Sequence, residues 1–298
     1  MNLSGKTIAV TGVTGFLGTY IALELLKRGA KVRGVVRTPQ KGAWLEAKGV
    51  SLKKADLMDP NALCEAFKGA DAIVSNAALF TMKQASWNDF YFPNKLGTEN
   101  VFNAAQNAAV RRLVQVSSVA VYRSRLPNNI PESTPRLTEL QRGKYWNYAI
   151  TKSLSEGIAW DLAAKYRQQL TVVRPGPIYG QRDKNITPFI TKVFRWPFVP
   201  APTIGFPAVH AGDVAKGIAQ ALETDTSIGK AYNLTGPAEP VLKLLQLWKE
   251  VSGSGPLLCP LPLPIRVSYD TSAAQIDLGF QTRSLREGIS ETFSKSIP

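Results

Sequence analysis

The sequence is poor in the residues that bind metals and form disulfides. Its 298 residues include one histidine, His210, and two cysteines, Cys64 and Cys259. A single histidine excludes a multi-histidine metal site and argues against a serine–histidine hydrolase. We expect His210 to be structural, at the start of a helix near Asp213. The cysteines form no disulfide framework, and we expect both to be free, buried thiols.

Long apolar runs are missing, and acidic residues are few. No run approaches the ~20 apolar residues of a membrane span, and the first residues do not resemble a signal peptide, so we expect a cytoplasmic protein. Twenty-two acidic residues against 36 Lys and Arg give a net charge of +14. Because the cations are scattered, we interpret the charge as solvated surface and attraction for an anionic cofactor. We expect no specific nucleic-acid partner and no metal.

The first 175 residues alternate apolar strands with helices. We expect strands near 7–11, 31–37, 50–54, 71–75, 111–116 and 169–174, and long helices near 86–107 and 144–167. Most of these strands are continuous apolar runs, which suit a parallel sheet buried on both faces. The pattern predicts an α/β fold with a doubly wound parallel sheet of the Rossmann type.

Proline becomes dense after Arg174, and a second proline-rich stretch runs from Pro256 to Pro264. Prolines interrupt regular elements and form rigid loops. We therefore predict a dinucleotide-binding domain at 1–175, to which 206–235 return. Residues 176–205 and 236–298 would form a smaller, substrate-binding lobe.

A glycine-rich turn follows the first predicted strand. Gly12, Gly15 and Gly18 stand between the strand 7–11 and an amphipathic helix that ends near Arg28. Gly12 can take a tight turn, Gly15 lets a pyrophosphate approach the backbone, and Gly18 lets the helix pack closely. The free N–H groups of that helix would bind the phosphates. The alternative is an ordinary strand-to-helix turn.

Tyr148 and Lys152 are four residues apart within the predicted helix 144–167. Residues at this spacing share one helix face. At ~4 Å and an effective dielectric of ~20, an ammonium would stabilise a phenolate by ~4 kcal/mol, or about three pKa units. The pair is therefore suited to general acid–base catalysis, although a solvated helix face has the same spacing.

These motifs together resemble the extended short-chain dehydrogenases/reductases, in the epimerase/dehydratase-like branch. The glycine spacing is GxxGxxG, and YxxxK follows in the middle of the chain. Further matching motifs come in the family's order along nearly the whole chain: Asp56-Leu57, Asn76-Ala77-Ala78, residues 94–100, 116–122, 174–180, 210–215 and 232–234. The pattern is most similar to the 3β-hydroxysteroid dehydrogenases and dihydroflavonol reductases.

The resemblance implies a Ser-Tyr-Lys site. Tyr148 would be the general acid/base, Lys152 would lower its pKa and bind the nicotinamide ribose, and Ser118 would hold the substrate oxygen. Ser117, whose side chain should point to the opposite face of the strand, is the candidate for merely capping a turn.

The cofactor-binding residues would be Gly12, Thr14, Gly15, Phe16, Leu17, Arg37, Asp56, Leu57, Asn76, Ala77, Ala78, Tyr148, Lys152, Pro175 and Ile178. Asp56 would bind the adenine amino group or serve the start of a helix. Asn94, disfavoured in a helix interior, should have a buried bonding role.

The end of the second strand favours NADP over NAD. NAD enzymes usually have an acid there, whereas this chain has Arg37, with Arg33 or Lys41 to support it. An arginine can pair with a 2′-phosphate and contributes about 1.5–3 kcal/mol. The alternative is a surface arginine.

Two departures bear on the substrate. Pro177 stands where sugar-nucleotide members of the family usually carry an asparagine, and Arg123 stands where a glycine is common. The first argues against nucleotide sugars, and the second leaves the local loop shape open. We predict an NADP-preferring oxidoreductase acting on a mostly apolar alcohol or ketone, steroid-, terpenoid- or flavonoid-like. A nucleotide-sugar epimerase or dehydratase with bound NAD and a non-catalytic NADP-binding subunit are the alternatives.

Apolar residues beyond one core-facing stripe predict a homodimer that pairs the two long helices. They are Val101, Phe102, Ile158 and Trp160.

Overall fold

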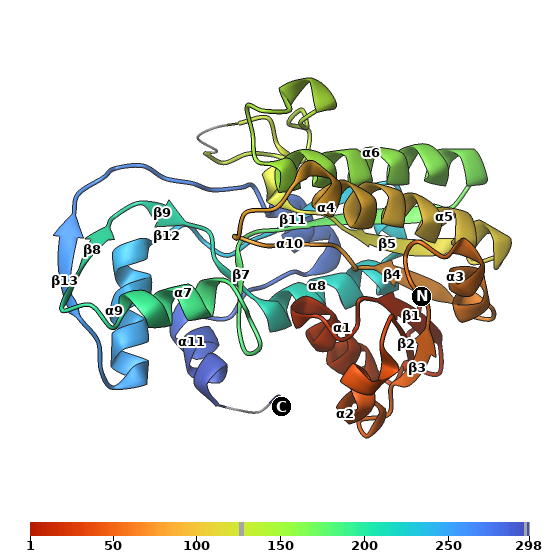
Figure 1. The fold of residues 1–298 in the computed structure, drawn as a ribbon, viewed down its shortest axis with the longest axis horizontal. Helices are drawn as coiled ribbons and strands as arrows, with labels where there is room; N and C mark the ends of the chain where they lie inside the picture. Colours follow the sequence, from red (N-terminus) through yellow and green to blue (C-terminus); the bar gives the residue numbers. More distant parts are fainter. Residues whose placement is uncertain (125–127, 295–296, 298) are drawn as a thin grey trace.

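A computed structural model of the chain describes residues 1–124, 128–294 and 297. Its centre is a seven-stranded parallel sheet in the order β11-β6-β5-β4-β1-β2-β3 (Figure 1). The strands are β1 (Thr7–Thr11), β2 (Lys31–Val36), β3 (Ser51–Lys54), β4 (Ala72–Ser75), β5 (Arg112–Val116), β6 (Gln169–Pro175) and β11 (Ala231–Leu234). The predicted doubly wound α/β fold is confirmed.

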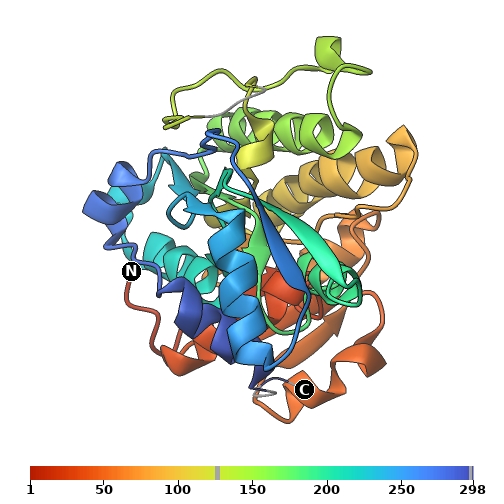
Figure 2. The same ribbon diagram turned by 90° about the vertical axis from the view of Figure 1, so that its left-hand side faces the viewer.

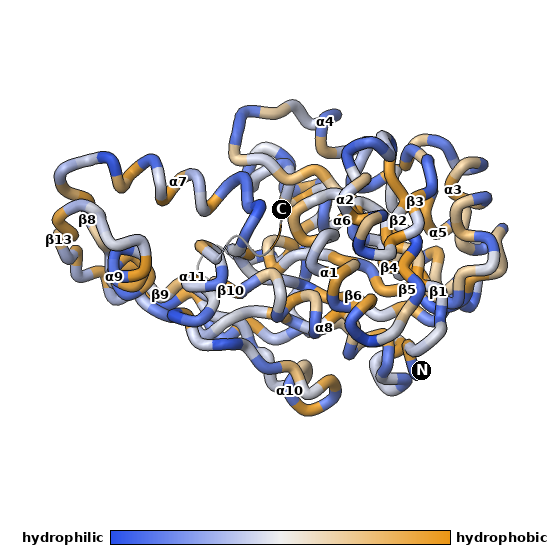
Figure 3. The backbone as a smooth tube through the Cα atoms, turned by 90° about the horizontal axis from the view of Figure 1, so that it is seen from below, coloured by the Kyte–Doolittle hydropathy of each residue, from blue (hydrophilic) through white to orange (hydrophobic). Residues whose placement is uncertain are grey.

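Helices cover both faces of this sheet. One face carries α1 (Phe16–Lys27) and α8 (Ala211–Glu223), and the other carries α3 (Pro60–Phe67), α5 (Gly97–Asn107) and α6 (Asn147–Tyr166). The central strands β1, β4 and β5 are hydrophobic along much of their length (Figure 3), because both of their faces are buried. None of the helices in the described part of the chain is long and apolar enough to cross a membrane.

The predicted helix over 86–107 is three elements. They are α4 (Trp87–Tyr91), a π-helical segment (Phe92–Leu96) and α5. Pro93 lies in the π-helical segment and has no N–H to donate to the preceding turn, which accounts for the irregular winding. Val101 and Phe102, which we expected at a dimer interface, are instead buried in the core of this subunit.

A second, smaller lobe lies beyond the carboxyl ends of the strands (Figures 1 and 2). Its core packs residues of α7 (Ile186–Val193), β8 (Phe198–Pro202), α9 (Val241–Ser252) and α11 (Leu285–Phe293). The remaining elements are α2 (Ala43–Glu46), β7 (Ile178–Tyr179), β9 (Gly205–Phe206), β10 (Val209–His210), β12 (Glu239–Pro240), β13 (Leu257–Leu261), α10 (Ser272–Leu278) and 3₁₀ turns at Pro39–Gly42, Val119–Val121, Glu139–Gln141 and Asp225–Ser227.

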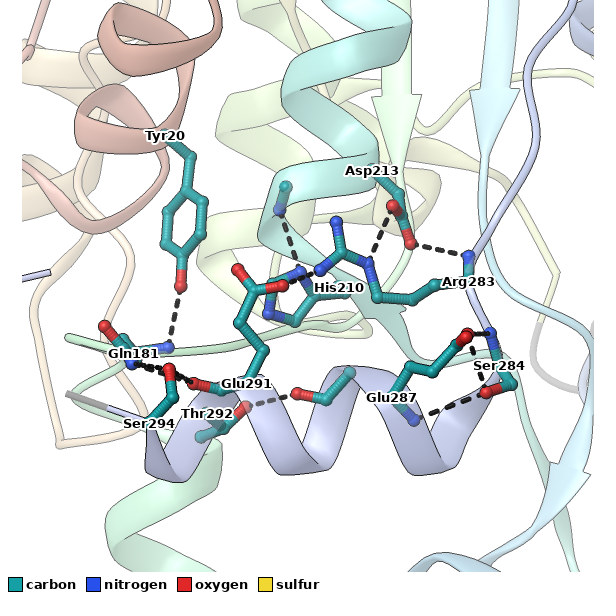
Figure 4. A network of polar contacts seen from close by, with 12 residues as sticks. Tyr20, Gln181, His210, Asp213, Arg283, Ser284, Glu287, Glu291, Thr292 and Ser294 are labelled. Atoms are coloured by element: carbon teal, nitrogen blue, oxygen red, sulfur yellow. Dashed lines mark hydrogen bonds and ion pairs between the residues drawn. The ribbon is translucent and has the colours of Figure 1, made fainter. Parts of the chain in front are cut away.

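Polar contacts fix the lobe to the sheet (Figure 4). The hydroxyl of Tyr20, on α1, accepts a hydrogen bond of 2.8 Å from the N–H of Gln181. Arg283 forms an ion pair of 2.9 Å with Asp213 on α8 and a second one with Glu291 on α11. The lobe is thereby connected to both helices on one face of the sheet.

His210 caps α8, as expected of a structural histidine. Its Nδ1 accepts a hydrogen bond of 3.1 Å from the N–H of Gly212. Burial, together with the cations Arg283 and Lys216, lowers the pKa of His210 to about 3. The imidazole is therefore neutral at physiological pH, which is the form that Nδ1 needs in order to accept.

One of the two cysteines is not buried. Both are free thiols, but Cys64 is half-buried and Cys259 is exposed. The expectation of a buried Cys259 is wrong because its strand, β13, belongs to a two-stranded sheet with only one face on the lobe core.

Candidate active site

The predicted cofactor-binding residues other than Tyr148 and Lys152, which lie on α6, are at the carboxyl ends of strands, at one edge of the sheet. The glycine-rich turn follows β1, Arg37 follows β2, and Asp56 and Leu57 follow β3. Asn76 to Ala78 follow β4, while Pro175 and Ile178 lie at and beyond the end of β6. In a parallel sheet this edge is where ligands bind.

The glycine-rich turn has the geometry that a dinucleotide needs. Gly12 has φ +68°, and a Cβ on it would lie 2.9 Å from Cα of Ala77. A Cβ on Gly18 would lie 2.1 Å from the carbonyl oxygen of Gly12, so only glycine lets α1 pack this closely. Gly15 caps α1 without a side-chain hydrogen bond, and the first turn has no acid. The free N–H groups at the start of α1 can therefore bind a phosphate. The glycine-rich turn and the start of α1 thus fit a dinucleotide cofactor.

Asn76 and Ala77 hold the end of β4 against this turn. The N–H groups of both residues donate to Oγ1 of Thr11, each at 3.0 Å. The Asn76 amide also donates to the carbonyl of Thr11 at 3.3 Å. These contacts use the side chain of Asn76 for structure, and its backbone faces the same edge as the glycine-rich turn.

The segment after β2 carries the residue that we expect to choose the cofactor. Arg37 is exposed, and the 3₁₀ turn that follows packs on the glycine-rich turn, since a Cβ on Gly42 would lie 3.1 Å from Thr14. Arg33 cannot support Arg37, because its guanidinium donates to the carbonyls of Ala66 and Lys68. Any support falls to Lys41, which is exposed.

Asp56 and Leu57 are fixed by local contacts. Asp56 is exposed, and its Oδ1 accepts from the N–H of Met58 at 2.9 Å. The cap of α3 is Asp59, not Asp56. Asn100 donates to the carbonyl of Leu57 at 2.8 Å. Asp56 therefore stabilises a turn while its side chain remains exposed to solvent.

Tyr148 and Ser118 are brought together at the end of β5. Tyr148 lies in the first turn of α6, and Ser118 follows β5. Burial raises the pKa of Tyr148 to about 12, against the hydrogen bond with Ser118, which lowers it. The lowered tyrosine pKa that the sequence suggested is wrong for this structure, because burial outweighs the contacts that stabilise the phenolate.

Lys152 is buried one turn beyond Tyr148, and its ammonium has a different partner. Its Nζ donates to the carbonyl of Val116 at 2.7 Å. Burial lowers the pKa of Lys152 to about 8, against the charge of Glu156, which raises it. The ammonium is thus held at the end of β5.

Glu156, which sequence reasoning missed, is the buried counter-ion of this site. Its carboxylate accepts from Arg174 at 2.5 and 3.1 Å and from the hydroxyl of Ser117 at 2.6 Å. Ser117 therefore serves this ion pair, while the turn after β5 is capped by Ser118. The sequence did contain an indication of this role, since Glu156 continues the four-residue spacing of Tyr148 and Lys152 on the same helix face.

Three aromatic side chains surround Tyr148, and the sequence did not reveal them. Ring centroids of Phe80, Trp146 and Phe90 lie 5.0, 4.8 and 6.2 Å from that of Tyr148. Phe90 is buried, whereas Phe80 and Trp146 are 42% and 44% exposed. We call these three residues the aromatic wall.

Asn94 fixes the loop that carries the aromatic wall's Phe80, in the buried bonding role that we expected. Its Oδ1 accepts from the N–H of Leu79 at 2.7 Å, and its Nδ2 donates to the carbonyl of Leu79 at 3.2 Å. It also donates to Thr151 on α6 at 3.2 Å. The backbone is its partner, and the loop is thereby joined to the helix of Tyr148.

A separate polar cavity of about 770 Å³ lies beside the end of β11, between the segments 235–238 and 266–282. None of Ser118, Tyr148 and Lys152 lines it. The candidate active site is therefore defined by the contacts of Tyr148 and not by this cavity.

Comparison with known proteins agrees with this geometry. The model of the NAD dependent epimerase/dehydratase family matches residues 8–235. The chain belongs to this family. The resemblance inferred from the motifs is confirmed.

Among similar proteins are two reductases. A 4-hydroxy-2-methyl-3-oxo-4-farnesyl-3,4-dihydroquinoline-1-oxide ketoreductase of Stigmatella aurantiaca is 32% identical over 252 residues, which cover 82% of this chain and 72% of that protein. Cinnamoyl-CoA reductase 1 of Petunia hybrida is 35% identical over 193 residues, or 60% of this chain. The match spans 56% of the petunia protein. Both relatives are reductases by name, and the chain spans little more than half the length of the petunia protein.

Solved structures share the fold. The UDP-glucuronic acid 4-epimerase from Bacillus cereus, in complex with NAD, has a TM-score of 0.81 at 19% identity, over 96% of both chains. At that identity the likeness shows the fold alone.

Proposed function

We propose that this protein is an NADP-preferring oxidoreductase that interconverts a secondary alcohol and a ketone on a mostly apolar small molecule. Steroid-, terpenoid- or flavonoid-like carbonyls are the proposed class. The observation that supports this most is the surrounding of Tyr148, where the neighbouring hydroxyl of Ser118 is combined with the exposed rings of Phe80 and Trp146. An aromatic wall beside a proton donor suits an apolar carbonyl compound better than a sugar.

In the proposed reaction Tyr148 moves the proton. When bound, the nicotinamide cofactor supplies or accepts the hydride. Because the pKa of Tyr148 is raised to about 12, its phenol is protonated at neutral pH, which is the form that ketone reduction needs. Ser118 orients the substrate oxygen toward this proton. Lys152, whose charged form is favoured by Glu156, is the proposed partner of the cofactor's ribose.

We also propose separate binding roles for the two parts of the chain. Residues 1–175 and 206–235 would bind the cofactor, and 176–205 with 236–298 would close over the substrate. We further propose a cytoplasmic homodimer that pairs α5 and α6 of two copies. Ile158 and Trp160 remain half-buried and available for that contact.

The aromatic wall should determine which carbonyl compounds are reduced. Phe80→Ala and Trp146→Ala should each raise KM for apolar ketones by about tenfold or more, since each removes an exposed aromatic face from the site. The kcat should change little, because the proton donor remains. A panel of ketones assayed by NADPH consumption gives both constants.

Phe92→Ala is the matched control for this prediction. Phe92 is similarly exposed and packs on Tyr91, away from Tyr148. Its KM should match that of the wild type. A best substrate that is a nucleotide sugar, or equal effects of all three changes, would refute the proposed substrate class.

Arg37 should decide the choice between NADP and NAD. Arg37→Asp should weaken the binding of NADP by about 1.5–3 kcal/mol, or roughly ten- to a hundredfold in affinity. The reason is that an acid repels the 2′-phosphate that an arginine attracts. The preference should also weaken with salt, since Arg37 is exposed. We would measure kcat/KM for both cofactors at two ionic strengths.

Arg33→Gln is the control for Arg37, because the Arg33 guanidinium is bound to backbone carbonyls of the α3 end. It should leave the ratio of the two cofactors unchanged. A wild type that uses NAD better than NADP would overturn the NADP preference while leaving the oxidoreductase class intact.

A further inference from the structure

The end of the lobe farthest from the parallel sheet carries an outward face made of apolar side chains. It belongs to the two-stranded parallel sheet of β8 and β13, which Figure 2 views from the end of the molecule. In this pairing Phe198 stands opposite Leu257, and Pro200 opposite Cys259. All four are exposed. With the neighbouring exposed Trp196 and Leu261, we call them the apolar end face.

The apolar end face is not an unfinished part of the core. The alternate residues of β8, Val199 and Ala201, point inward and are buried with Trp248 and Leu244 of α9. The outward residues remain in water, with Phe198 61% and Leu257 68% exposed. An outward strand face is ordinarily polar, so this one has the character of an interaction surface.

Exposed apolar side chains are concentrated around this face. Of the fourteen large apolar side chains exposed in the described residues, six lie in the segments 184–212 and 251–269. They are Phe189, Trp196, Phe198, Leu257, Leu261 and Ile265. Four of the six, Trp196, Phe198, Leu257 and Leu261, belong to the apolar end face, and such a group needs an explanation that scattered single residues do not.

The charge around the apolar end face is mainly positive. The two segments that form it, 184–212 and 251–269, contain no acidic residue. They do contain exposed Lys192 and Arg195, and the nearby exposed acid, Glu250 of α9, is paired with Arg286. The occupant of this face must therefore be apolar at its centre and negative at its rim.

We propose that this end of the molecule binds the surface of an anionic lipid bilayer. A second copy of the chain is disfavoured, because a symmetric contact would bring Arg195 and its neighbours against their own like charges. A protein partner is disfavoured because the indole N–H of Trp196 is the one strong hydrogen-bond donor among the side chains of the apolar end face, and interfaces use about one hydrogen bond per 100–200 Å². Exposed Trp, Phe and Leu with flanking Lys and Arg are the combination that inserts at a bilayer interface.

The lobe would then lie against the bilayer, with the parallel sheet directed away from it (Figure 1). Trp196 and Phe198 would enter the boundary between headgroups and acyl chains, and Lys192 and Arg195 would contact the headgroups. This inference rests on the surface of the lobe alone and does not depend on the proposed function.

Vesicle sedimentation tests the proposal. The full-length protein should sediment with vesicles of phosphatidylcholine and phosphatidylserine, and much less with phosphatidylcholine alone. High salt should release it. The double change Phe198→Ser with Leu257→Ser should lower the partition constant by about tenfold or more, and Arg195→Gln by about fivefold. Wild-type protein that stays in the supernatant at low salt would overturn the proposal.

Ile276→Ser is the matched control. Ile276 is 80% exposed on α10, outside the two segments, so its loss should not change partitioning. Thermal melting of each variant shows that it is folded. Equal binding by the double variant and the wild type would refute the assignment of this face. So would light scattering that shows a dimer held by Phe198 and Leu257, without vesicle binding, because it would assign the face to a second copy.

Discussion

Replacing Tyr148 by phenylalanine should lower kcat by at least about a hundredfold while leaving cofactor affinity nearly unchanged. The hydroxyl is the proposed proton donor, and general acid–base catalysis contributes about 10²–10⁴. The ring itself should remain packed on Phe80 and Trp146, since only the oxygen is removed. Steady-state kinetics with NADPH and a reducible ketone, together with cofactor binding by fluorescence, measure both quantities.

Tyr145→Phe is the control for this change. It removes a neighbouring phenol that is half-buried just before α6 and packs near Ala149 and Leu137 rather than on Tyr148. Its kcat should be that of the wild type. A Tyr148→Phe protein that kept more than a small fraction of its kcat would remove Tyr148 from the mechanism.

Replacing Glu156 by alanine should have the largest effect on stability. The change leaves the buried guanidinium of Arg174 without its carboxylate, and breaking a buried ion pair costs about 3–5 kcal/mol. The free energy of unfolding in urea measures it. Arg136→Ala is the control, because Arg136 reaches Glu156 at only 3.5 Å and is partly exposed, so its loss should cost less than about 1 kcal/mol.

The same residue predicts a pH dependence. Burial opposes ionisation of Glu156, but the hydrogen bonds and charge of Arg174 outweigh it and hold its pKa below the ordinary value. The pair's contribution to stability is therefore present above the pKa of an unfolded-state glutamate and is lost as pH falls through the lower folded-state pKa. Glu156→Gln should remove this acid-dependent loss. Equal stability of wild type and Glu156→Ala above neutral pH would contradict the ion pair's role.

The sequence predicted well what depends on neighbouring residues. Continuous apolar runs such as Ala72–Ser75 predicted the buried strands, because a strand covered on both faces needs no polar alternation. The glycine-rich turn was also predictable, since the positive φ of Gly12 and the close packing of Gly18 are local demands that only glycine meets.

What the sequence did not show depends on distant segments. Phe80 and Tyr148 meet only because Asn94 holds the loop after β4 against α6, and no spacing along the chain encodes that contact. The pKa of Tyr148 was misjudged for the same reason, since its burial arises from the surrounding fold. Lys152 likewise found its partner in Val116, on a strand that its own helix covers.

The position of β11 has a consequence for synthesis on the ribosome. β11 and α8 are made after residue 210, yet α8 packs on α1, and β11 completes the sheet beside β6. A nascent chain that ends before residue 211 therefore lacks the cover for apolar side chains of α1 such as Ile21 and Leu25. At about 5–20 residues per second, this surface stays uncovered for seconds in every round of translation. During that interval the unfinished chain is a natural client for chaperones that bind exposed apolar segments.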